Sequence, residues 1–168
     1  IMPRIAPLEG GQVTGKAGQL LKEFEAEWGM VPNIVRTLAH APDVLEGYLA
    51  AERSLSRGTL SARLREQIAI TVAEANGSDY CLAVHSAVGR AVGLSQEALA
   101  DARRGSSPDR RVDAALVFAG RIVSRSGRLD DELRNLRDAG YSEQEIVEII
   151  ANVSLNIFTN YFNQIVGT

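Results

Sequence analysis

Residues 61–92 read SARLREQIAITVAEANGSDYCLAVHSAVGRAV, a stretch that predicts two helices joined by a short turn. Ser61 is a favourable N-cap for the first helix. The apolar residues of this helix recur at helical spacing and are Leu64, Ile68, Val72 and Ala75. Asn76 and Gly77 favour its end, and the second helix is predicted over residues 79–92. If the two helices pack antiparallel, side chains far apart in sequence meet across the turn.

Caps and helix breakers predict helices along the rest of the chain, and no stretch shows the alternation typical of a strand. The expected helices begin near Leu20, Asn33, Pro42, Ala62, Asp79, Gln96, Pro108, Asp130 and Glu143. Ser107 is expected to cap the helix that Pro108 opens, and Ser142 begins a capping box. Residues 1–14 are rich in proline and glycine and are expected to form an irregular arm. We therefore predict an all-α protein with about eight to nine helices in a single domain over residues 15–168.

The composition is that of an ordinary globular protein, with 45% hydrophobic and 23% charged residues among 168. The chain has 18 Lys and Arg against 21 Asp and Glu, a net charge of −3. This balance argues against a nucleic-acid partner, because phosphate contacts normally require a basic surplus. The one cysteine, Cys81, cannot form an internal disulfide or a multi-cysteine zinc site. We therefore expect no metal, no cofactor and a reducing, cytoplasmic location.

The last predicted helix contains the longest uncharged stretch, residues 149–168. The stretch has the length of a membrane span, but its many amides would be costly in lipid, so no membrane partner is expected. A helix that is apolar nearly all round is expected to be buried, either centrally or in a subunit interface. Its asparagines form one narrow stripe at Asn152, Asn156, Asn160 and Asn163. They either bond neighbouring helices or a symmetry mate, or they form a wall of an active-site cavity.

Three residues of the helix pair could carry chemistry. Cys81 and His85 are four residues apart on one predicted helix, so their side chains share a face. Cys81 lies in the first turn, where the positive end of the helix favours a thiolate, and a neighbouring imidazole can accept the thiol proton. Glu66 on the preceding helix faces His85 if the pair is antiparallel. The residues alone leave two interpretations open: a Cys–His–Glu proton path, or a small buried cysteine beside a structural histidine.

The stretch from Glu66 to His85, EQIAITVAEANGSDYCLAVH, resembles the signature of the AhpD-like, or carboxymuconolactone decarboxylase-like, family. That signature is Glu, eleven residues, Cys, two residues, Cys, three residues, His. The same spacing is filled here by Glu66, Ser78, Cys81 and His85. The stretches PNIVRTLAHAPDVLEGYLA and GLSQEALADAR and the asparagine-rich last helix are also similar, so the resemblance covers roughly residues 30–165.

The resemblance implies an all-helical fold, a homo-oligomer (commonly a trimer or hexamer) and alkylhydroperoxidase-type thiol chemistry. In members with both cysteines, the second attacks the peroxide and becomes a sulfenic acid, which the first resolves as a disulfide. Carried over, Cys81 is the nucleophile, and His85 and Glu66 relay protons. Ser78 stands in place of the resolving cysteine, so turnover requires an external thiol or a thiol protein. We expect Ser78 to cap the second helix, and Tyr80 to pack beside Cys81 or donate its hydroxyl.

Three functions follow from these observations, and the first is the one that we predict. It is a thiol-dependent peroxidase that reduces small organic hydroperoxides. Its pocket is expected to be apolar and lined by Val72, Tyr80, Val84 and Phe158. The second is a carboxymuconolactone decarboxylase-like lyase, in which His85 and Glu66 transfer protons and need no thiol. Arg63 or Arg65 would then anchor a substrate carboxylate. The third is a non-catalytic oligomeric protein that binds a ligand or senses redox state.

Overall fold

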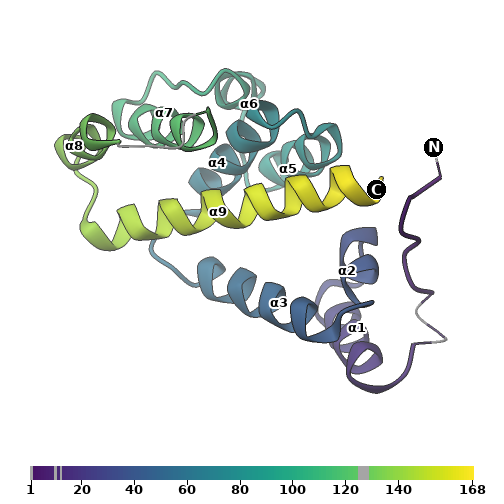
Figure 1. Cartoon of the computed structure of the whole chain (residues 1–168). Helices are drawn as coiled ribbons and strands as arrows, with labels where there is room; N and C mark the ends of the chain where they lie inside the picture. Colours follow the sequence, from purple (N-terminus) through teal and green to yellow (C-terminus); the bar gives the residue numbers. More distant parts are fainter. Residues whose placement is uncertain (1, 10, 12, 125–128) are drawn as a thin grey trace. The chain divides into compact units, whose positions relative to one another are not determined.

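A computed structural model describes residues 2–9, 11, 13–124 and 129–168, and all regular secondary structure in these ranges is helical (Figure 1). The nine helices in the described residues are α1 Gly15–Trp28, α2 Asn33–Leu38, α3 Pro42–Ser56, α4 Ala62–Ala75, α5 Asp79–Ala91, α6 Gln96–Arg103, α7 Arg110–Ser124, α8 Asp130–Asp138 and α9 Glu143–Val166. The predicted all-α fold is confirmed. The irregular segment before α1 also ends where the sequence indicated.

Within this fold the chain forms two compact units. We call Ile1–Ser54 together with Phe162–Thr168 the terminal unit, and Leu55–Tyr161 the motif unit. The motif unit contains the helix pair predicted from residues 61–92, so it holds the candidate site.

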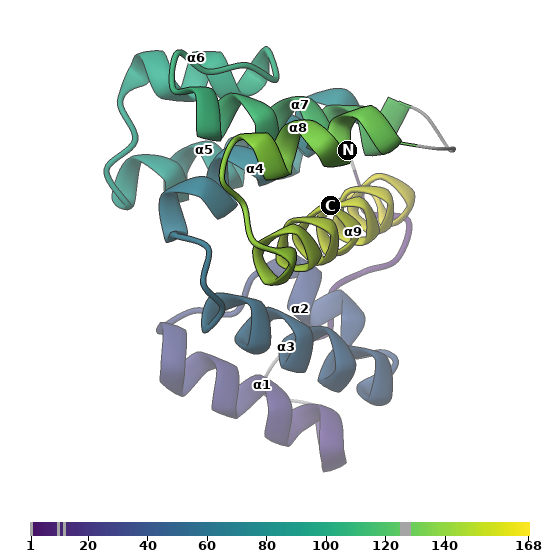
Figure 2. The same ribbon diagram turned by 90° about the vertical axis from the view of Figure 1, so that its left-hand side faces the viewer.

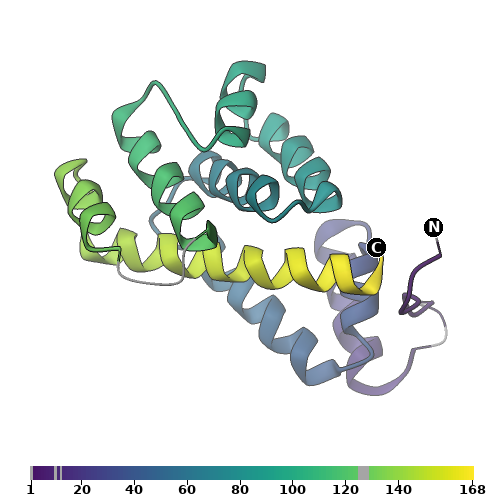
Figure 3. The same ribbon diagram turned by 45° about the horizontal axis from the view of Figure 1, so that its top comes forward.

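The centre of the motif unit is α4, which packs against α5, α6 and α7, while α8 packs against α7 (Figures 2 and 3). Its buried positions are Leu64 and the seven consecutive residues from Gln67 to Ala73, which is far more than one apolar stripe. The helix is enclosed because neighbours cover several of its faces. The largest fully buried side chains of this core include Ile68, Ile70, Val72, Leu116, Leu136, Ile149 and Val153.

In the terminal unit, α1, α2 and α3 bury a second apolar cluster that includes Leu21, Val35, Leu45 and Leu49. The irregular segment before α1 is bonded to this unit at several points. The N–H of Leu8 donates to the carbonyl of Arg36 at 3.2 Å, and the N–H of Arg4 donates to the carbonyl of Val166 at 2.6 Å. The arm is therefore irregular in conformation but tied to its unit by backbone hydrogen bonds.

Most of the helix caps follow the sequence. Ser61 accepts a hydrogen bond from the N–H of Leu64, as predicted, and Ser95 accepts one from the N–H of Ala98. Ser142 and Glu145 form the predicted capping box, with each side chain bonded to the other's N–H.

One exception is α7, which Ser107 was expected to cap. The helix begins at Arg110, and Asp109 is its cap: its carboxylate accepts from the N–H groups of Arg111 at 2.8 Å and Val112 at 3.1 Å. The Ser107 hydroxyl instead accepts from the N–H of Asp109 at 3.2 Å. A carboxylate is the stronger acceptor at the positive end of a helix, so the cap lies two residues later.

The last helix, α9, is not buried all round within the single chain, so central burial, one of the two predicted alternatives, is not observed. In the motif unit Ile146, Ile149 and Val153 are buried in the core, whereas Val147 is 63% exposed. Two of its asparagines bond their own helix: the amides of Asn152 and Asn156 donate to backbone carbonyls four residues earlier, at 2.8 Å each. Among the described residues, no helix combines the length and the apolar character needed to cross a bilayer.

Candidate active site

The site is organised by the turn between α4 and α5. Asn76 ends α4, Gly77 adopts φ +63°, and Ser78 precedes α5. The N–H of Ser78 donates to the carbonyl of Ala73 at 2.9 Å, which closes the helix end over the left-handed glycine. The turn is short enough to return α5 along α4, and the two helices pack closely.

This packing brings Glu66 and His85 together. Oε2 of Glu66 lies 2.9 Å from Nδ1 of His85, although the residues are nineteen apart in sequence. Both side chains are partly buried, with exposed fractions of 18% for Glu66 and 24% for His85. The predicted contact is confirmed. It favours the tautomer in which Nδ1 donates to the carboxylate, and it leaves Nε2 for proton exchange.

Cys81 lies in the first turn of α5, one turn before His85 on the same helix face. Its exposed fraction is 4%, so the thiol is sheltered from bulk solvent. Asp79 is the one acidic residue of this first turn. A sheltered thiol at the positive end of a helix, beside a carboxylate-bonded imidazole, has the elements of an activated nucleophile.

Ser78 occupies the N-cap position of α5, but its side chain makes no capping hydrogen bond, contrary to the prediction. Its backbone is at φ −95° and ψ 84°, outside the extended region from which Ser61 and Ser95 cap their helices. The preceding left-handed Gly77 imposes this geometry. Ser78 is buried, and its hydroxyl does not serve as a cap.

Tyr80 is half-buried and directly precedes Cys81. Burial raises the pKa of its phenol above the ordinary value of 10.0, and the negative charge of a Cys81 thiolate raises it further. The phenol is therefore neutral at physiological pH. Tyr80 is electrostatically close to the sulfur and retains a proton that it can donate.

A buried amide pair beside the turn was not predicted as part of the site. Nδ2 of Asn76 donates to Oδ1 of Asn160 on α9 at 3.0 Å. Asn160 is fully buried, and its own Nδ2 has no hydrogen-bond partner in the part of the chain that the structure describes. The asparagine stripe of α9 was the available signal, and one of its members does bond the helix-pair turn.

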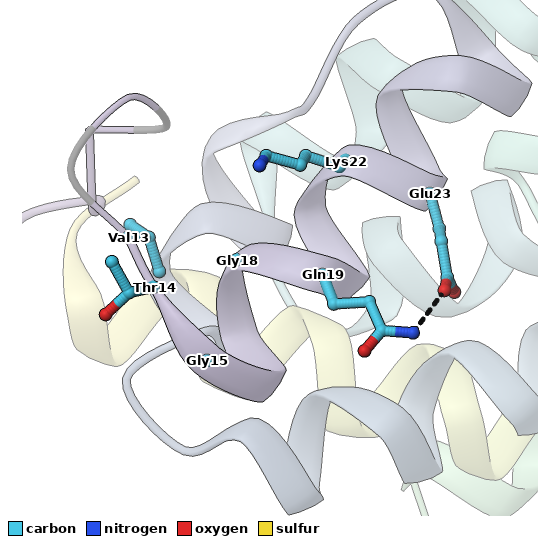
Figure 4. Close-up of a pocket in the computed structure, with 7 residues that line it drawn as sticks. All are labelled: Val13, Thr14, Gly15, Gly18, Gln19, Lys22 and Glu23. Carbon is cyan, nitrogen blue, oxygen red and sulfur yellow. Dashed lines mark hydrogen bonds between the residues drawn. The ribbon is translucent and has the colours of Figure 1, made fainter.

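The expected apolar pocket is not formed by the residues proposed for it. Val72 belongs to the fully buried core, and Val84 and Phe158 are exposed. A cavity of about 440 Å³ lies instead beside the start of α1, where Gln19 bonds Glu23 (Figure 4). Two others lie in the motif unit, and neither is lined by Cys81, His85 or Glu66.

The two arginines suggested as carboxylate anchors do not join His85. Nη1 of Arg65 donates to the carbonyl of Leu60 at 2.6 Å, which occupies this side chain at the start of its own helix. Arg63 lines a cavity whose walls do not include His85. In the described ranges, no group of three or more His, Cys, Asp or Glu side chains is arranged to hold a metal ion.

A family model, the carboxymuconolactone decarboxylase family, matches residues 40–124, which include the whole α4–α5 pair. The chain belongs to the carboxymuconolactone decarboxylase family. The resemblance noted on Glu66, Cys81 and His85 is therefore confirmed at the level of the family. All three residues lie inside the matched segment of this family member.

Solved structures share the fold of this carboxymuconolactone decarboxylase family chain over nearly its full length. An AhpD-core, uncharacterized peroxidase-related protein from Ralstonia eutropha JMP134 has 24% identity and a TM-score of 0.85, covering 99% of this chain and 91% of its own. A peroxidase-related protein from Silicibacter sp. TM1040 has 22% identity and a TM-score of 0.84, covering 100% and 93%.

A third structure is a cysteine-to-alanine variant of the debrominase Bmp8 in complex with 2,3,4-tribromopyrrole. It has 20% identity and a TM-score of 0.84, covering 100% of this chain and 91% of its own. The comparison with curated proteins gave no match. At these identities the solved structures establish the fold of this family member.

Proposed function

We propose that the chain is a thiol-dependent peroxidase that reduces small organic hydroperoxides through a sulfenic acid on Cys81. The observation that carries the proposal is the 2.9 Å contact between Glu66 and His85 on the helix pair that bears the cysteine. A histidine held in this way can take a proton from a thiol one helical turn away. The sheltered position of Cys81 suits a small oxidant and protects a sulfenic acid from over-oxidation.

The reaction begins with proton transfer from the Cys81 thiol to His85. The thiolate then attacks the terminal peroxide oxygen; an S–O bond forms, the O–O bond breaks, and the leaving alkoxide takes the proton from His85. The products of this half are an alcohol and the Cys81 sulfenic acid. Glu66 holds the imidazole and stabilises its protonated form during the transfer.

Reduction uses two external thiols, since the 168-residue sequence contains one cysteine. The first thiol displaces water from the sulfenic acid and forms a mixed disulfide with Cys81. The second thiol attacks that disulfide, restores the Cys81 thiol and leaves as an external disulfide. The net reaction converts one hydroperoxide and two thiols into one alcohol, one water and one disulfide.

The test is consumption of cumene hydroperoxide with dithiothreitol as reductant. Wild-type protein is expected to exceed Cys81→Ser by about 100-fold, and Ala83→Ser, an exposed change on the same helix, is expected to match wild type. Intact-mass analysis after one equivalent of peroxide should show one added oxygen on the Cys81 peptide. Equal rates for wild type and Cys81→Ser would eliminate the proposal.

The second candidate is a lyase of the carboxymuconolactone decarboxylase type, which the family match and the Glu66–His85 contact both favour. In this case the pair transfers protons without any role for sulfur. Decarboxylation of carboxymuconolactone that survives Cys81→Ser but is lost in His85→Ala would establish the lyase and replace the peroxidase.

We also propose that copies of this chain assemble into a homo-oligomer. Support comes from the exposed face of α9 within the motif unit, where Val147, Ile150, Phe158 and Tyr161 leave apolar surface in the single chain. Sedimentation velocity should show a trimer or hexamer, and Val147→Glu should shift it toward smaller species. A wild-type monomer at all concentrations would remove this part of the proposal.

A further inference from the structure

A second cavity of the motif unit lies away from the cysteine and has a volume of about 490 Å³. This volume falls within the roughly 300–1,000 Å³ typical of small-molecule sites. Three helices start at its wall, since Ser61, Ser95 and Asp109, the caps of α4, α6 and α7, all line it. The N-terminal ends of three helices therefore meet at one cavity. The ends of α7 and α6 already face the carboxylates of Asp109 and Glu97, so the end of α4, capped by the neutral Ser61, is the one that favours a negatively charged occupant.

Gln67 supplies an independent indication of a ligand. Its exposed fraction is 7%, it lines this cavity, and its amide makes no hydrogen bond with any described residue. The side chain is largely buried while its amide borders the cavity, so the amide is placed to hydrogen-bond a molecule bound there. Both its donor and its acceptor remain available there.

The charges around the cavity are mostly neutralised by the protein itself. Asp101 pairs with Arg104, and Asp109 is engaged by the N–H groups of α7. Arg111 pairs with Glu145 at 2.5 Å and lies over the ring of Tyr141, 4.4 Å from its centre.

Two charged side chains of the cavity wall are not neutralised in this way, Glu97 and Arg63. Glu97 is in the first turn of α6, where its own backbone N–H and the Ser95 hydroxyl hold the pKa of its carboxyl below the usual value. Arg63 has neither an ion pair nor a hydrogen bond with the described residues. It precedes Gln67 by four residues on α4, so the guanidinium and the buried amide share one helix face.

We propose that this cavity binds a small organic carboxylate, with the carboxylate accepting hydrogen bonds from the Arg63 guanidinium and the Gln67 amide. The apolar part of the ligand would pack against Leu64, Ala98 and Val112, which line the same cavity. Guanidinium and carboxylate match in geometry, which gives such a pair its specificity. The site is separate from Cys81, and the proposal does not depend on the peroxidase reaction.

The test is a titration of the isotope-labelled full chain, followed by the side-chain amide resonances of Gln67. Benzoate and hexanoate are the probes, and benzamide is the uncharged control. The carboxylates should shift these resonances saturably and benzamide should not. Arg63→Gln should weaken binding at least about tenfold, because a charge-assisted hydrogen bond is lost. Arg90→Gln, an exposed arginine on α5 outside the cavity, should leave binding unchanged.

Loss of ligand binding can be distinguished from loss of the fold, because Arg63 is exposed and its replacement leaves the core intact. Circular dichroism of each variant checks the fold. No saturable shift with either carboxylate, or equal shifts with benzamide, overturns the proposal. Concentration-dependent protection of the Gln67 amide without any probe also overturns it, because a second copy of the chain would then cover the cavity.

Discussion

Glu66 on α4 and His85 on α5 lie 2.9 Å apart, carboxylate oxygen to Nδ1, across a turn of three residues. The contact requires a fixed register between the helices, because a shift of one residue turns each side chain about 100° around its helix. The turn therefore acts as the element that sets the chemistry of the site.

Glu66→Gln is expected to lower kcat for peroxide reduction about 100-fold while KM changes little. Glutamine keeps the size of the side chain but loses the charge that stabilises the protonated imidazole during proton transfer. Steady-state kinetics with cumene hydroperoxide measure the effect. Glu74→Gln is the control on the same helix, because its side chain pairs with Arg103 at the surface. If kcat fell by a similar factor in both variants, the loss would reflect the change in overall charge, and the role assigned to Glu66 would be contradicted.

Ser78→Cys is expected to restore an internal disulfide cycle. Residues three apart at a helix start have Cα atoms close enough for a disulfide, and Ser78 is buried on the side of the turn that precedes Cys81. After one equivalent of peroxide, the variant should lose two hydrogen atoms, as a disulfide forms and water leaves. Wild type should gain one oxygen. A stable added oxygen in the variant as well would show that the two side chains do not meet.

Gly77→Ala is expected to destabilise the protein by about 1 kcal/mol, because Gly77 has φ +63° and an alanine is strained there. Gly120→Ala, in the same unit, is expected to have the opposite effect on stability. Gly120 lies inside α7, and an added Cβ would meet Thr71 at an ordinary contact distance of 3.8 Å, so stability should rise by about 0.5 kcal/mol. Urea unfolding measures both. Equal effects of the two substitutions would contradict the assigned turn geometry.

The free energy of unfolding is expected to fall between pH 10 and 12 because the phenol of Tyr141 ionises. Burial raises the pKa of its phenol to about 12 from 10.0, so the folded state holds the proton more tightly than the unfolded chain does. The resulting stabilisation is complete below pH 10 and is lost as pH rises through 12. Comparing the unfolding of wild type and Tyr141→Phe across this range isolates the effect. Tyr161→Phe, which changes an exposed phenol, should reproduce the wild-type slope.

The Tyr141 hydroxyl also donates to the carbonyl of Arg111 at 3.0 Å. Tyr141→Phe should therefore cost about 1 kcal/mol of stability at neutral pH as well. A variant as stable as wild type at pH 7, with an unchanged alkaline slope, would contradict both expectations.

The sequence by itself determined the helices, most of their ends and the face on which the reactive residues lie. These features depend on groups a few residues apart: Ser61 reaches Leu64, Ser142 and Glu145 bond each other, and Cys81 is one turn from His85. Even the contact between Glu66 and His85 follows from one short turn and two helices of known rise.

The tertiary structure alone decided burial. Val72 enters the core because α4 is enclosed by its neighbours. The cavity at Gln67 also depends on where α6 and α7 begin against α4. Such outcomes are set by segments distant in sequence, and no local pattern encodes which of them will meet.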